Sequence, residues 1–480
     1  MSLKVTTIQN FIGGAFTTSS ASNTLESYNP ATGEVIARFP DSTPQDVDQA
    51  VAAARRAFPA WSATPRWERA RILLRVADLV EERLEELAKA ETCDQGKSIT
   101  ASRTLDIPRV AYNFRFFGTK IMHILDVTVR QETAQSQVQR RPVGVAALIS
   151  PWNFPLYLLT TKIAACLATG NTCVCKPSEF TPLTAYLFCS ILKEAGVPDG
   201  VVNMVFGTGS VAGNALVVHP DVPLVSFTGG TTTGRKITEA SAQHFKRLSL
   251  ELGGKNAFLA FEDCDLEKCL TWAIKSAYGN SGQACVASSR IFVQKSIWDR
   301  FVPAFIERTR AIKVGDPLDP STELGPLNST QHLERVLSYV ALAKSEGGKI
   351  ECGGDRLASH PNGCFLVPTV ITGLGPKTRT MQEEIFGPVV CIAPFETEEE
   401  AIELANGTKF GLSCCVFTEN GARQRRVSEK VHAGSVWVNC FMARDLSMPF
   451  GGFKQSGIGR EGGEWSIDFF TETKCVCFAD

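Results

Sequence analysis

The sequence has almost no excess of charge and no long apolar run, and each absence excludes a class of function. Its 480 residues contain 49 Lys and Arg against 50 Asp and Glu, so no basic surface for nucleic acid is expected. No apolar stretch approaches the roughly 18 residues that a membrane-spanning helix needs. The N-terminus also lacks the apolar stretch of a secretory signal. We therefore expect a cytoplasmic protein that binds neither nucleic acid nor membranes.

Metal sites and disulfides also have little support. None of the sixteen cysteines forms a C-x-x-C pair, and none of the six histidines falls in an H-E-x-x-H pattern, so no metal is expected. A chain of this length, 44% hydrophobic, fills a core without disulfides. Most of the cysteines are therefore expected in the core.

Two phosphate-binding motifs are incomplete. The pair Gly207 and Gly209 is followed by Gly213, one residue too late for the dinucleotide fingerprint G-x-G-x-x-G. The triplet Gly96-Lys-Ser98 resembles the end of a P-loop, but Glu91 stands where that loop needs glycine. We interpret this triplet as the C-terminus of a helix.

Helix signals occupy much of the first hundred residues. Thr43 and Asp46 form a capping box around Pro44, which predicts a helix from there to about Phe58. Apolar residues three and four positions apart predict a second long helix that ends near 94–96. They are Leu73, Val76, Val80, Leu84 and Leu87. We therefore expect residues 1–100 to be mainly helical.

From Val143 onward, short β-branched runs alternate with helix-length segments, which predicts parallel β-α-β units. A second such set begins at Ser289 and predicts a second α/β domain. Ligands of such sheets bind beyond the carboxyl ends of the strands. The candidate site segments are therefore those that follow the first runs: Pro151–Asn153, Lys176–Glu179, Gly207, Thr228–Gly230 and Glu251–Gly254.

Two segments carry groups suited to catalysis. Glu251 ends an apolar strand directly before Gly253 and Gly254, and burial there would raise its pKa and make it a usable base near neutral pH. The alternative is a structural pair with an Arg or Lys. Cys285 lies on the polar loop Tyr278–Val286, where a thiol is accessible to a ligand. The alternative for it is an inert core cysteine.

Seven motifs together resemble the NAD(P)-dependent aldehyde dehydrogenase superfamily, over essentially the whole chain. In order, they are Pro151-Trp-Asn-Phe-Pro155, Lys176-Pro-Ser-Glu179, Phe227-Thr-Gly229, LELGGKN (250–256), GNSGQAC (279–285), Glu383-Glu-Ile-Phe-Gly-Pro388 and Pro449-Phe-Gly-Gly452. Their order and spacing are comparable with those of the family. The resemblance implies an α/β fold with a Rossmann-like cofactor domain, an α/β catalytic domain and a small β oligomerisation element.

The resemblance also implies the domain limits. Residues 1–122 and 142–253 would form the NAD-binding domain, residues 254–453 the catalytic domain, and residues 123–141 and 464–480 the oligomerisation element. The stretches Val127–Arg141 and Thr471–Phe478 alternate in polarity like edge strands. Pairing of such edges between subunits implies a homodimer or homotetramer.

By similarity, Cys285 is the nucleophile that attacks the aldehyde carbon, and Glu251 is the base. The side-chain amide of Asn153 and the backbone N–H of Cys285 would stabilise the oxyanion. NAD is the implied cofactor, because a carboxylate at Glu179 would repel the additional phosphate of NADP. At Gly230, many relatives have serine. The implied cofactor-binding residues are Ile149, Trp152, Lys176, Glu179, Gly229, Gly230, Leu252, Glu384 and Phe386.

Three segments, 107–117, 155–159 and 438–446, are most similar to the muconate semialdehyde branch of the superfamily. This similarity implies oxidation of 2-aminomuconate 6-semialdehyde in tryptophan (kynurenine) degradation, with Arg115 and Arg444 holding its carboxylate. Tyr157 and Phe450 would form the apolar wall of the pocket. The alternatives are a solvated Arg115 and an Arg444 paired with Asp445. Other open readings are another aldehyde (2-hydroxymuconate semialdehyde, betaine aldehyde or retinal) or a catalytically idle structural member of the superfamily.

Overall fold

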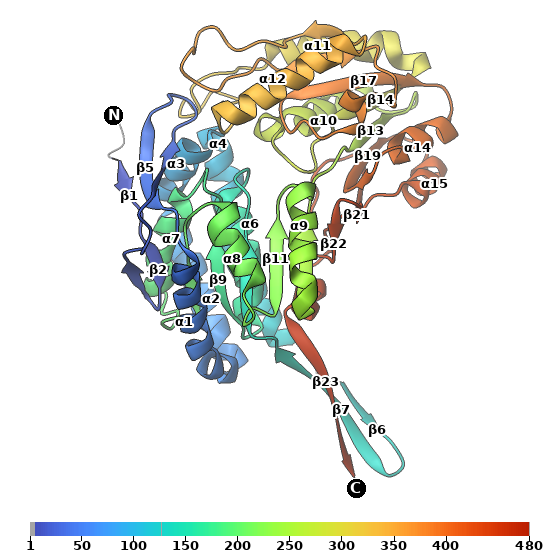
Figure 1. Ribbon diagram of the computed structural model, residues 1–480. Coiled ribbons are helices and arrows are strands. Elements are labelled where there is room, and N and C mark those ends of the chain that lie inside the picture. The colour runs from blue at the N-terminus through green and yellow to red at the C-terminus, as the bar shows by residue number, and fades with distance from the viewer. Residues whose placement is uncertain (1–4, 126, 480) are drawn as a thin grey trace.

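Two open sheets and a projecting β-arm organise the computed structural model, which describes residues 5–125 and 127–479 (Figure 1). The first sheet has eight strands, in the order β22 (Gly457–Ile458), β12 (Arg247–Glu251), β11 (Leu224–Thr228), β8 (Val145–Ile149), β9 (Thr172–Lys176), β10 (Val202–Met204), β2 (Asn10–Ile12) and β3 (Ala15–Thr17). Its five central strands are parallel. The prediction of an α/β fold with parallel β-α-β units is confirmed.

The carboxyl ends of these parallel strands meet at one edge of the first sheet. Ile149 at the end of β8 is paired in register with Lys176 at the end of β9. On the other side, Thr228 of β11 is in register with Glu251 of β12. The loops after the four strands therefore emerge side by side, as the sequence predicted for this sheet.

The second sheet has seven strands, in the order β15 (Lys349–Cys352), β16 (Thr369–Thr372), β17 (Val389–Phe395), β14 (Arg290–Gln294), β13 (Ala257–Ala260), β19 (Ser413–Phe417) and β20 (Ser435–Val438). All neighbouring strands except β15 are parallel. The loops that precede β13, β14 and β17 lie at the same edge, because Ala257 is in register with Arg290 and Arg290 with Cys391. This sheet therefore presents the amino ends of its strands to the site.

Helices cover both faces of each sheet, because alternate side chains of a buried strand point to opposite faces. In β8, Ala146 and Leu148 face one core and Val145 and Ala147 the other. The helices are α1 (Pro44–Ala63), α2 (Arg66–Glu82), α3 (Leu84–Gln95), α4 (Ile99–Ala101), α5 (Ile107–Lys120), α6 (Pro155–Ala168), α7 (Leu183–Glu194), α8 (Asn214–Val218), α9 (Thr231–Ser241), α10 (Leu266–Tyr278), α11 (Trp298–Ala311), α12 (Thr330–Ser345), α13 (Arg379–Gln382), α14 (Glu398–Asn406), α15 (Gly421–Lys430) and α16 (Gly463–Phe469). Among the described residues, none of these helices is both long and apolar enough to cross a lipid bilayer.

The N-terminal region differs in two ways from the sequence-based expectation. Residues 6–40 form strands and not helices. Strands β1 (Thr6–Thr7), β4 (Thr24–Tyr28) and β5 (Val35–Pro40) make a small separate sheet, whereas β2 and β3 belong to the first sheet. The predicted second helix is broken at Arg83, where φ is −107° and ψ is 22°. This bend separates α2 from α3 and lets the apolar stripe, including Val80 and Leu87, stay buried on both sides of it.

Two sequence signals are found as predicted at the ends of helices. Thr43 and Asp46 form the reciprocal capping box at the start of α1. That helix continues past Phe58 to Ala63 and includes Pro59. Gly96 ends α3 in the left-handed conformation, with φ of 98°, as expected for the triplet that starts there.

The β-arm extends away from both sheets and carries the C-terminus at its tip (Figure 1). Its strands are β23 (Thr471–Ala479), β7 (Ala134–Pro142) and β6 (Val127–Arg130), in that order. Of the predicted edge strands, β6 and β23 do lie at the two edges of this sheet. The prediction is wrong for β7, because β7 pairs with β23 from Thr471↔Pro142 to Ala479↔Ala134 and with β6 on its other side. Residues 126 and 480 of the predicted oligomerisation element, and 1–4 of the predicted NAD-binding domain, lie outside the described residues.

Candidate active site

A cavity of about 140 Å³ lies where the carboxyl ends of the first sheet face the amino ends of the second. It collects nine of the residues predicted to act in catalysis or cofactor binding, from loops that are far apart along the chain. These are Trp152, Asn153, Gly229, Gly230, Glu251, Leu252, Cys285, Glu384 and Phe386. Pro151, Thr228, Gly253 and Arg335 complete the lining.

Cys285 follows a tight turn that begins at the end of α10. Asn280 and Ser281 adopt left-handed conformations in this turn, and Gly282 approaches the Gly387 carbonyl so closely that a Cβ would lie 2.1 Å from its oxygen. The turn therefore requires a glycine at position 282. Burial raises the pKa of the Cys285 thiol to about 12, and the negative charges of Glu384 and Glu251 add to this shift. The resting thiol is protonated and needs a base to become a nucleophile.

Glu251 lies at the end of β12 and is 4% exposed. Neither of its carboxylate oxygens has a hydrogen-bond partner in the part of the chain that the structure describes. Burial raises the pKa of this carboxyl well above its ordinary 4.5, the nearby negative charge of Glu461 raises it further, and the positive charge of Lys162 opposes both. A carboxyl with such a pKa is suited to accept a proton near neutral pH.

Lys162 and Glu461 form a buried ion pair close to Glu251, with 2.6 Å between Nζ and Oε1. Lys162 also donates to the hydroxyl of Ser226, at 3.0 Å. Neither charged residue belongs to a motif identified in the sequence. A signal was present for Lys162, because it is the single charge in the otherwise uncharged helix α6, and a buried lone lysine requires a partner.

Asn153 is held in place by hydrogen bonds at both ends of the residue. Its Nδ2 donates to the backbone carbonyl of Gln283 at 2.9 Å, which uses one of the two amide hydrogens. Its own backbone carbonyl accepts from Lys97 Nζ at 3.0 Å and from Asn280 Nδ2 at 2.9 Å. Asn153 therefore offers one further N–H from a fixed position beside the Cys285 loop.

The glycines and carboxylates of this region fit a dinucleotide. Gly230 is the N-cap of α9, whose first N–H groups favour an anion such as a phosphate. The Thr228 hydroxyl is buried in the cavity wall and has no hydrogen-bond partner among the described residues. Glu384 accepts a hydrogen bond from Gly254 N at 3.0 Å, and it lies so close to Gly253 that a Cβ there would be 2.1 Å from Oε2. The glycine pair therefore makes room for this carboxylate.

Lys176 and Glu179 lie beyond this cavity and pair with each other at 2.9 Å. The positive charge of Lys176 and hydrogen bonds keep the pKa of Glu179 below its ordinary value despite burial, so its carboxylate is ionised at neutral pH. Glu179 also lines a second recess, of about 470 Å³. Ile149 is buried at the end of β8 and its side chain packs in the core.

An aromatic wall closes one side of the cavity. The rings of Trp152 and Phe386 meet edge to face, with centroids 5.4 Å apart. Phe386 has a left-handed φ of 64°, and its carbonyl lies 2.7 Å from Nε2 of His332. Burial lowers the pKa of His332 to about 4, so the ring is neutral and donates this bond. No motif in the sequence pointed to His332.

Arg444, Tyr157 and Phe450 lie together, as predicted for a substrate pocket. Arg444 Nη1 is 3.3 Å from the Tyr157 hydroxyl, and its guanidinium carbon lies 4.0 Å from the centre of the Phe450 ring. Arg444 Nε and Nη2 are buried without a hydrogen-bond partner among the described residues. The alternative of a pair with Asp445 is not found, since that carboxylate accepts from Ser447 instead.

Arg115 is not brought to this pocket. It forms ion pairs on the surface with Asp78 at 2.9 Å and Glu81 at 2.6 Å, both on α2. Arg109, six residues earlier on α5, lies over the Tyr157 ring instead, with 5.6 Å to its centroid. Its Nε is buried and also lacks a partner among the described residues. Arg115 therefore does not lie beside Tyr157 as the sequence predicted, whereas Arg109 does.

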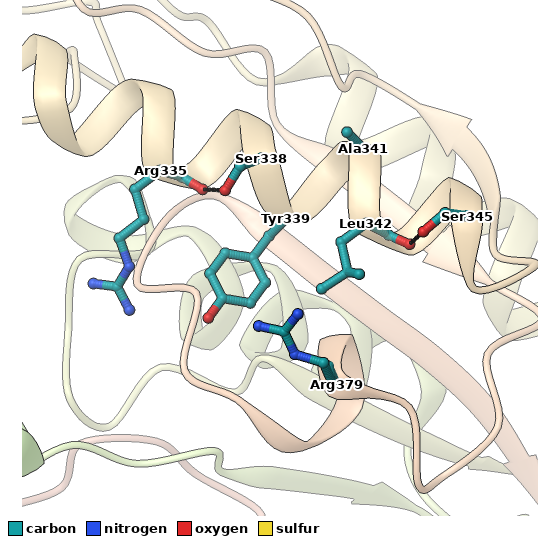
Figure 2. Close-up of a pocket in the computed structure, with 7 residues that line it drawn as sticks. All are labelled: Arg335, Ser338, Tyr339, Ala341, Leu342, Ser345 and Arg379. Atoms are coloured by element: carbon teal, nitrogen blue, oxygen red, sulfur yellow. Dashed lines mark hydrogen bonds between the residues drawn. The ribbon is translucent and has the colours of Figure 1, made fainter.

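Another recess lies elsewhere, on the exposed side of α12. It measures about 590 Å³, and Figure 2 shows Arg335, Tyr339 and Arg379 turned toward it. Arg335 is the one residue that it shares with the cavity beside Cys285. Arg379 is paired with Glu383 at 2.8 Å. The residues that line this recess include no cysteine and no carboxylate, so its size does not make it the reactive site.

Comparison with known proteins places this geometry in a family. The model of the aldehyde dehydrogenase family matches residues 16–476. A 2-aminomuconic semialdehyde dehydrogenase of Danio rerio is 51% identical over 99% of this chain and 98% of its own length. A 2-hydroxymuconic semialdehyde dehydrogenase of Pseudomonas sp. (strain CF600) is 44% identical, with 98% and 99% covered.

Solved structures agree with the sequence comparisons. The NAD+ complex of an aldehyde dehydrogenase from Bacillus cereus is 41% identical and superposes with a TM-score of 0.96, over 98% of this chain and 96% of that one. The resemblance drawn from the seven motifs, and the enzyme class and fold that it implied, are confirmed. The chain belongs to the aldehyde dehydrogenase family.

Proposed function

We propose that the protein oxidises 2-aminomuconate 6-semialdehyde to 2-aminomuconate with NAD+, a step of tryptophan (kynurenine) degradation. The observation that carries the substrate assignment is the pair of guanidinium groups with unpaired, buried N–H donors around Tyr157. Such donors pair bidentately with a carboxylate. The similarity to the 2-aminomuconic semialdehyde dehydrogenase of Danio rerio supports the same substrate.

Three residues of the cavity supply the chemistry on the protein side. Glu251 takes the proton of the Cys285 thiol, and the thiolate attacks the aldehyde carbon to form a thiohemiacetal. The second N–H of Asn153 and the backbone N–H of Cys285 donate to the oxyanion that this attack creates, and one such donor contributes about 3–4 kcal/mol to the transition state. The need for a base follows from the raised pKa of the thiol.

NAD+, held by the residues of the cofactor site, would supply the hydride acceptor for oxidation of the thiohemiacetal to a thioester on Cys285. After Glu251 has released the thiol proton to solvent, it removes a proton from water, and the resulting hydroxide attacks the thioester and releases the carboxylate product and the Cys285 thiol. In this proposal, Glu384 and Glu179 accept hydrogen bonds from ribose hydroxyls, and the backbone after Gly229 and Gly230 holds the pyrophosphate. The ionised carboxylate of Glu179 favours NAD+ over NADP+, because it repels a 2′-phosphate.

Arg109 and Arg444 hold the far end of the substrate in this proposal. Tyr157 lies between them, with Arg444 at its hydroxyl and Arg109 over its ring. Phe450 packs under the Arg444 guanidinium, so the arginine is desolvated and oriented before any ligand arrives. The attraction between these guanidinium groups and a carboxylate is stronger here than it would be in water, because the surroundings have a lower dielectric constant.

The direct test is NADH formation by the purified protein with enzymatically generated 2-aminomuconate 6-semialdehyde. Acetaldehyde, betaine aldehyde and retinal at matched concentrations serve as neutral or cationic controls. We expect kcat/KM for the acidic semialdehyde to exceed that for each control by at least about 100-fold. A flat profile across the panel contradicts the substrate assignment. 2-Hydroxymuconate semialdehyde, run in parallel, tests whether the amino substrate is preferred.

We also infer a homodimer or homotetramer in the cytoplasm. The outer strands β6 and β23 of the β-arm expose Val127, Val129 and Phe478, and pairing between subunits would cover them. All sixteen cysteines are free thiols, which is typical of a reducing compartment. The domain limits remain a proposal: 1–122 with 142–253, 254–453, and 123–141 with 464–480. In support, the boundary at 253/254 lies between β12 and β13, which belong to different sheets.

A further inference from the structure

We propose that Lys97 and Asn280 are positioning residues that fix the Asn153 amide relative to Cys285. The inference rests on the proposed function, in which Asn153 donates to the oxyanion. Both side chains donate to the same atom of Asn153, although one residue precedes Asn153 in the sequence and the other follows it. Lys97 Nζ lies 3.0 Å and Asn280 Nδ2 2.9 Å from the backbone carbonyl oxygen of Asn153.

Lys97 reaches Asn153 from a wholly buried ion pair. Its side chain and that of Asp106 are each 1% exposed, and the two are in direct contact. Lys97 Nζ also lies 4.2 Å from the centre of the Phe154 ring. A buried ion pair contributes little net stability, because desolvation of both charges offsets their attraction. The placement of this ion pair next to Asn153 therefore points to a role in orienting the Asn153 amide.

The local backbone supports this role of the ion pair. Asp106 ends a short π-helical segment, Ser102–Asp106, which interrupts the run between α4 and α5. Such segments are costly and are frequent at functional sites. Lys97 belongs to the glycine-lysine-serine triplet that the sequence reasoning set aside as a helix end. The triplet does end α3, and Gly96 turns the chain so that Lys97 enters the core.

Asn280 closes a ring of hydrogen bonds around Asn153. Its Nδ2 donates to the Asn153 carbonyl and, at 3.1 Å, to the carbonyl of Gln283. The Gln283 carbonyl accepts in turn from Asn153 Nδ2 at 2.9 Å. Gln283 is two residues before Cys285, so the ring ties the oxyanion donor to the loop of the nucleophile. Preorganised donors of this kind are effective because they need no reorientation during the reaction.

Asn280→Gly is the most specific variant with which to test this role. Asn280 has φ of 54° and ψ of 36°, a conformation that glycine adopts without strain, so the substitution removes the donor and leaves the turn. Ser281→Gly is the matched control. Ser281 has nearly the same backbone conformation, φ 55° and ψ 35°, but its hydroxyl donates to the Gly325 carbonyl at 2.9 Å.

We expect Asn280→Gly to lower kcat about 10-fold and to leave the KM for NAD+ within about twofold, because one side of the Asn153 cradle is lost. Ser281→Gly should keep kcat within about twofold. Both variants should unfold at similar temperatures. An unchanged kcat in Asn280→Gly, or an equal loss in Ser281→Gly, would overturn the proposal.

A double-mutant cycle with Asn153→Ala separates positioning from general structure. Once the amide is absent, Asn280→Gly and Lys97→Met should cause no further loss of kcat. Full additivity on the Asn153→Ala background overturns the positioning role. Full activity of Asn153→Ala alone instead contradicts the proposed oxyanion donor. The two failures are therefore distinguishable, and Asn280→Gly carries the test if Lys97→Met does not fold.

Discussion

The two ends of the proposed substrate path differ in how their hydrogen-bond donors are satisfied. At the reacting end, Asn153 makes one hydrogen bond with its side chain and two with its carbonyl, all within the protein. At the other end, Nε and Nη2 of Arg444 and Nε of Arg109 are buried without partners among the described residues. A buried unpaired donor costs about 1–3 kcal/mol.

This difference separates two kinds of recognition. Donors held by the protein are suited to a charge that develops during the reaction, because their geometry is fixed beforehand. Unpaired guanidinium donors are suited to a charge that the substrate brings with it, because the ligand removes their desolvation cost. Substitutions at the reacting end should therefore lower kcat, and those at the acid-binding end should raise KM.

Cys285→Ala should have the largest effect, since it removes the atom that bonds to the substrate. We expect kcat to fall by about 10⁴-fold or more for every aldehyde, acidic or neutral. Cys352→Ser, another partly exposed cysteine, is the matched control and should retain activity. Steady-state NADH formation measures both. Undiminished oxidation of the acidic semialdehyde by Cys285→Ala would mean that another residue is the nucleophile.

Glu251→Gln should lower kcat by about 100-fold or more, because the thiol then has no nearby base. In the wild-type protein, kcat/KM should rise with pH as Glu251, whose pKa burial raises, loses its proton. The variant should lose this rise. A pH profile of NADH formation for both proteins is the measurement, and an unchanged profile in the variant would assign the titration to another group.

Glu251→Gln, which should lower kcat, should raise the thermal stability of the protein. The pKa of Glu251 is higher in the folded protein than its ordinary 4.5, so the folded state binds more protons than the unfolded state above that pH. The contribution of Glu251 to the free energy of unfolding therefore decreases as the pH rises from about 4.5 through the raised pKa. Glu251→Gln should raise Tm more at pH 8 than at pH 5. Equal shifts at both pH values would contradict the burial argument.

Much of the reacting end could be predicted from the sequence, because each group follows a regular element. Glu251 ends an apolar strand and Asn153 follows another, so the rule for parallel sheets brings them to one edge. The rule does not cover Glu384 and Phe386, which lie before β17 at the amino edge of the other sheet. For these two, only the family resemblance carried the prediction.

The errors had identifiable physical causes. Arg115 and Arg109 are six residues apart on α5, which places them about 120° apart around the helix. The buried face of α5, with Val110, Phe114 and Phe117, could have shown that the two arginines have different surroundings. Lys162 meets Glu461, and Lys97 meets Asn153, only through tertiary contacts. No spacing in the sequence reports such contacts.

Arg444→Ala should weaken use of the acidic semialdehyde by roughly 10–150-fold in kcat/KM, mainly through KM. This range corresponds to the loss of one charge-assisted hydrogen bond, about 1.5–3 kcal/mol. Acetaldehyde should be oxidised with nearly unchanged kinetics, because it has no carboxylate. Arg444→Lys keeps the charge without the planar fork and should fall in between. An equal loss for both aldehydes would remove Arg444 from substrate recognition.

The two arginines of α5 give the smallest and most discriminating contrast. Arg109→Ala should raise the KM for the acidic semialdehyde roughly 10-fold, because its guanidinium lies over Tyr157 beside the pocket. Arg115→Ala should leave KM within about twofold, since its partners are Asp78 and Glu81 on the surface. Its ion pairs contribute only about 0.2–1 kcal/mol each to stability. If Arg115→Ala raises KM and Arg109→Ala does not, the carboxylate binds at another position along α5, and the acid-binding end described for Tyr157 is wrong.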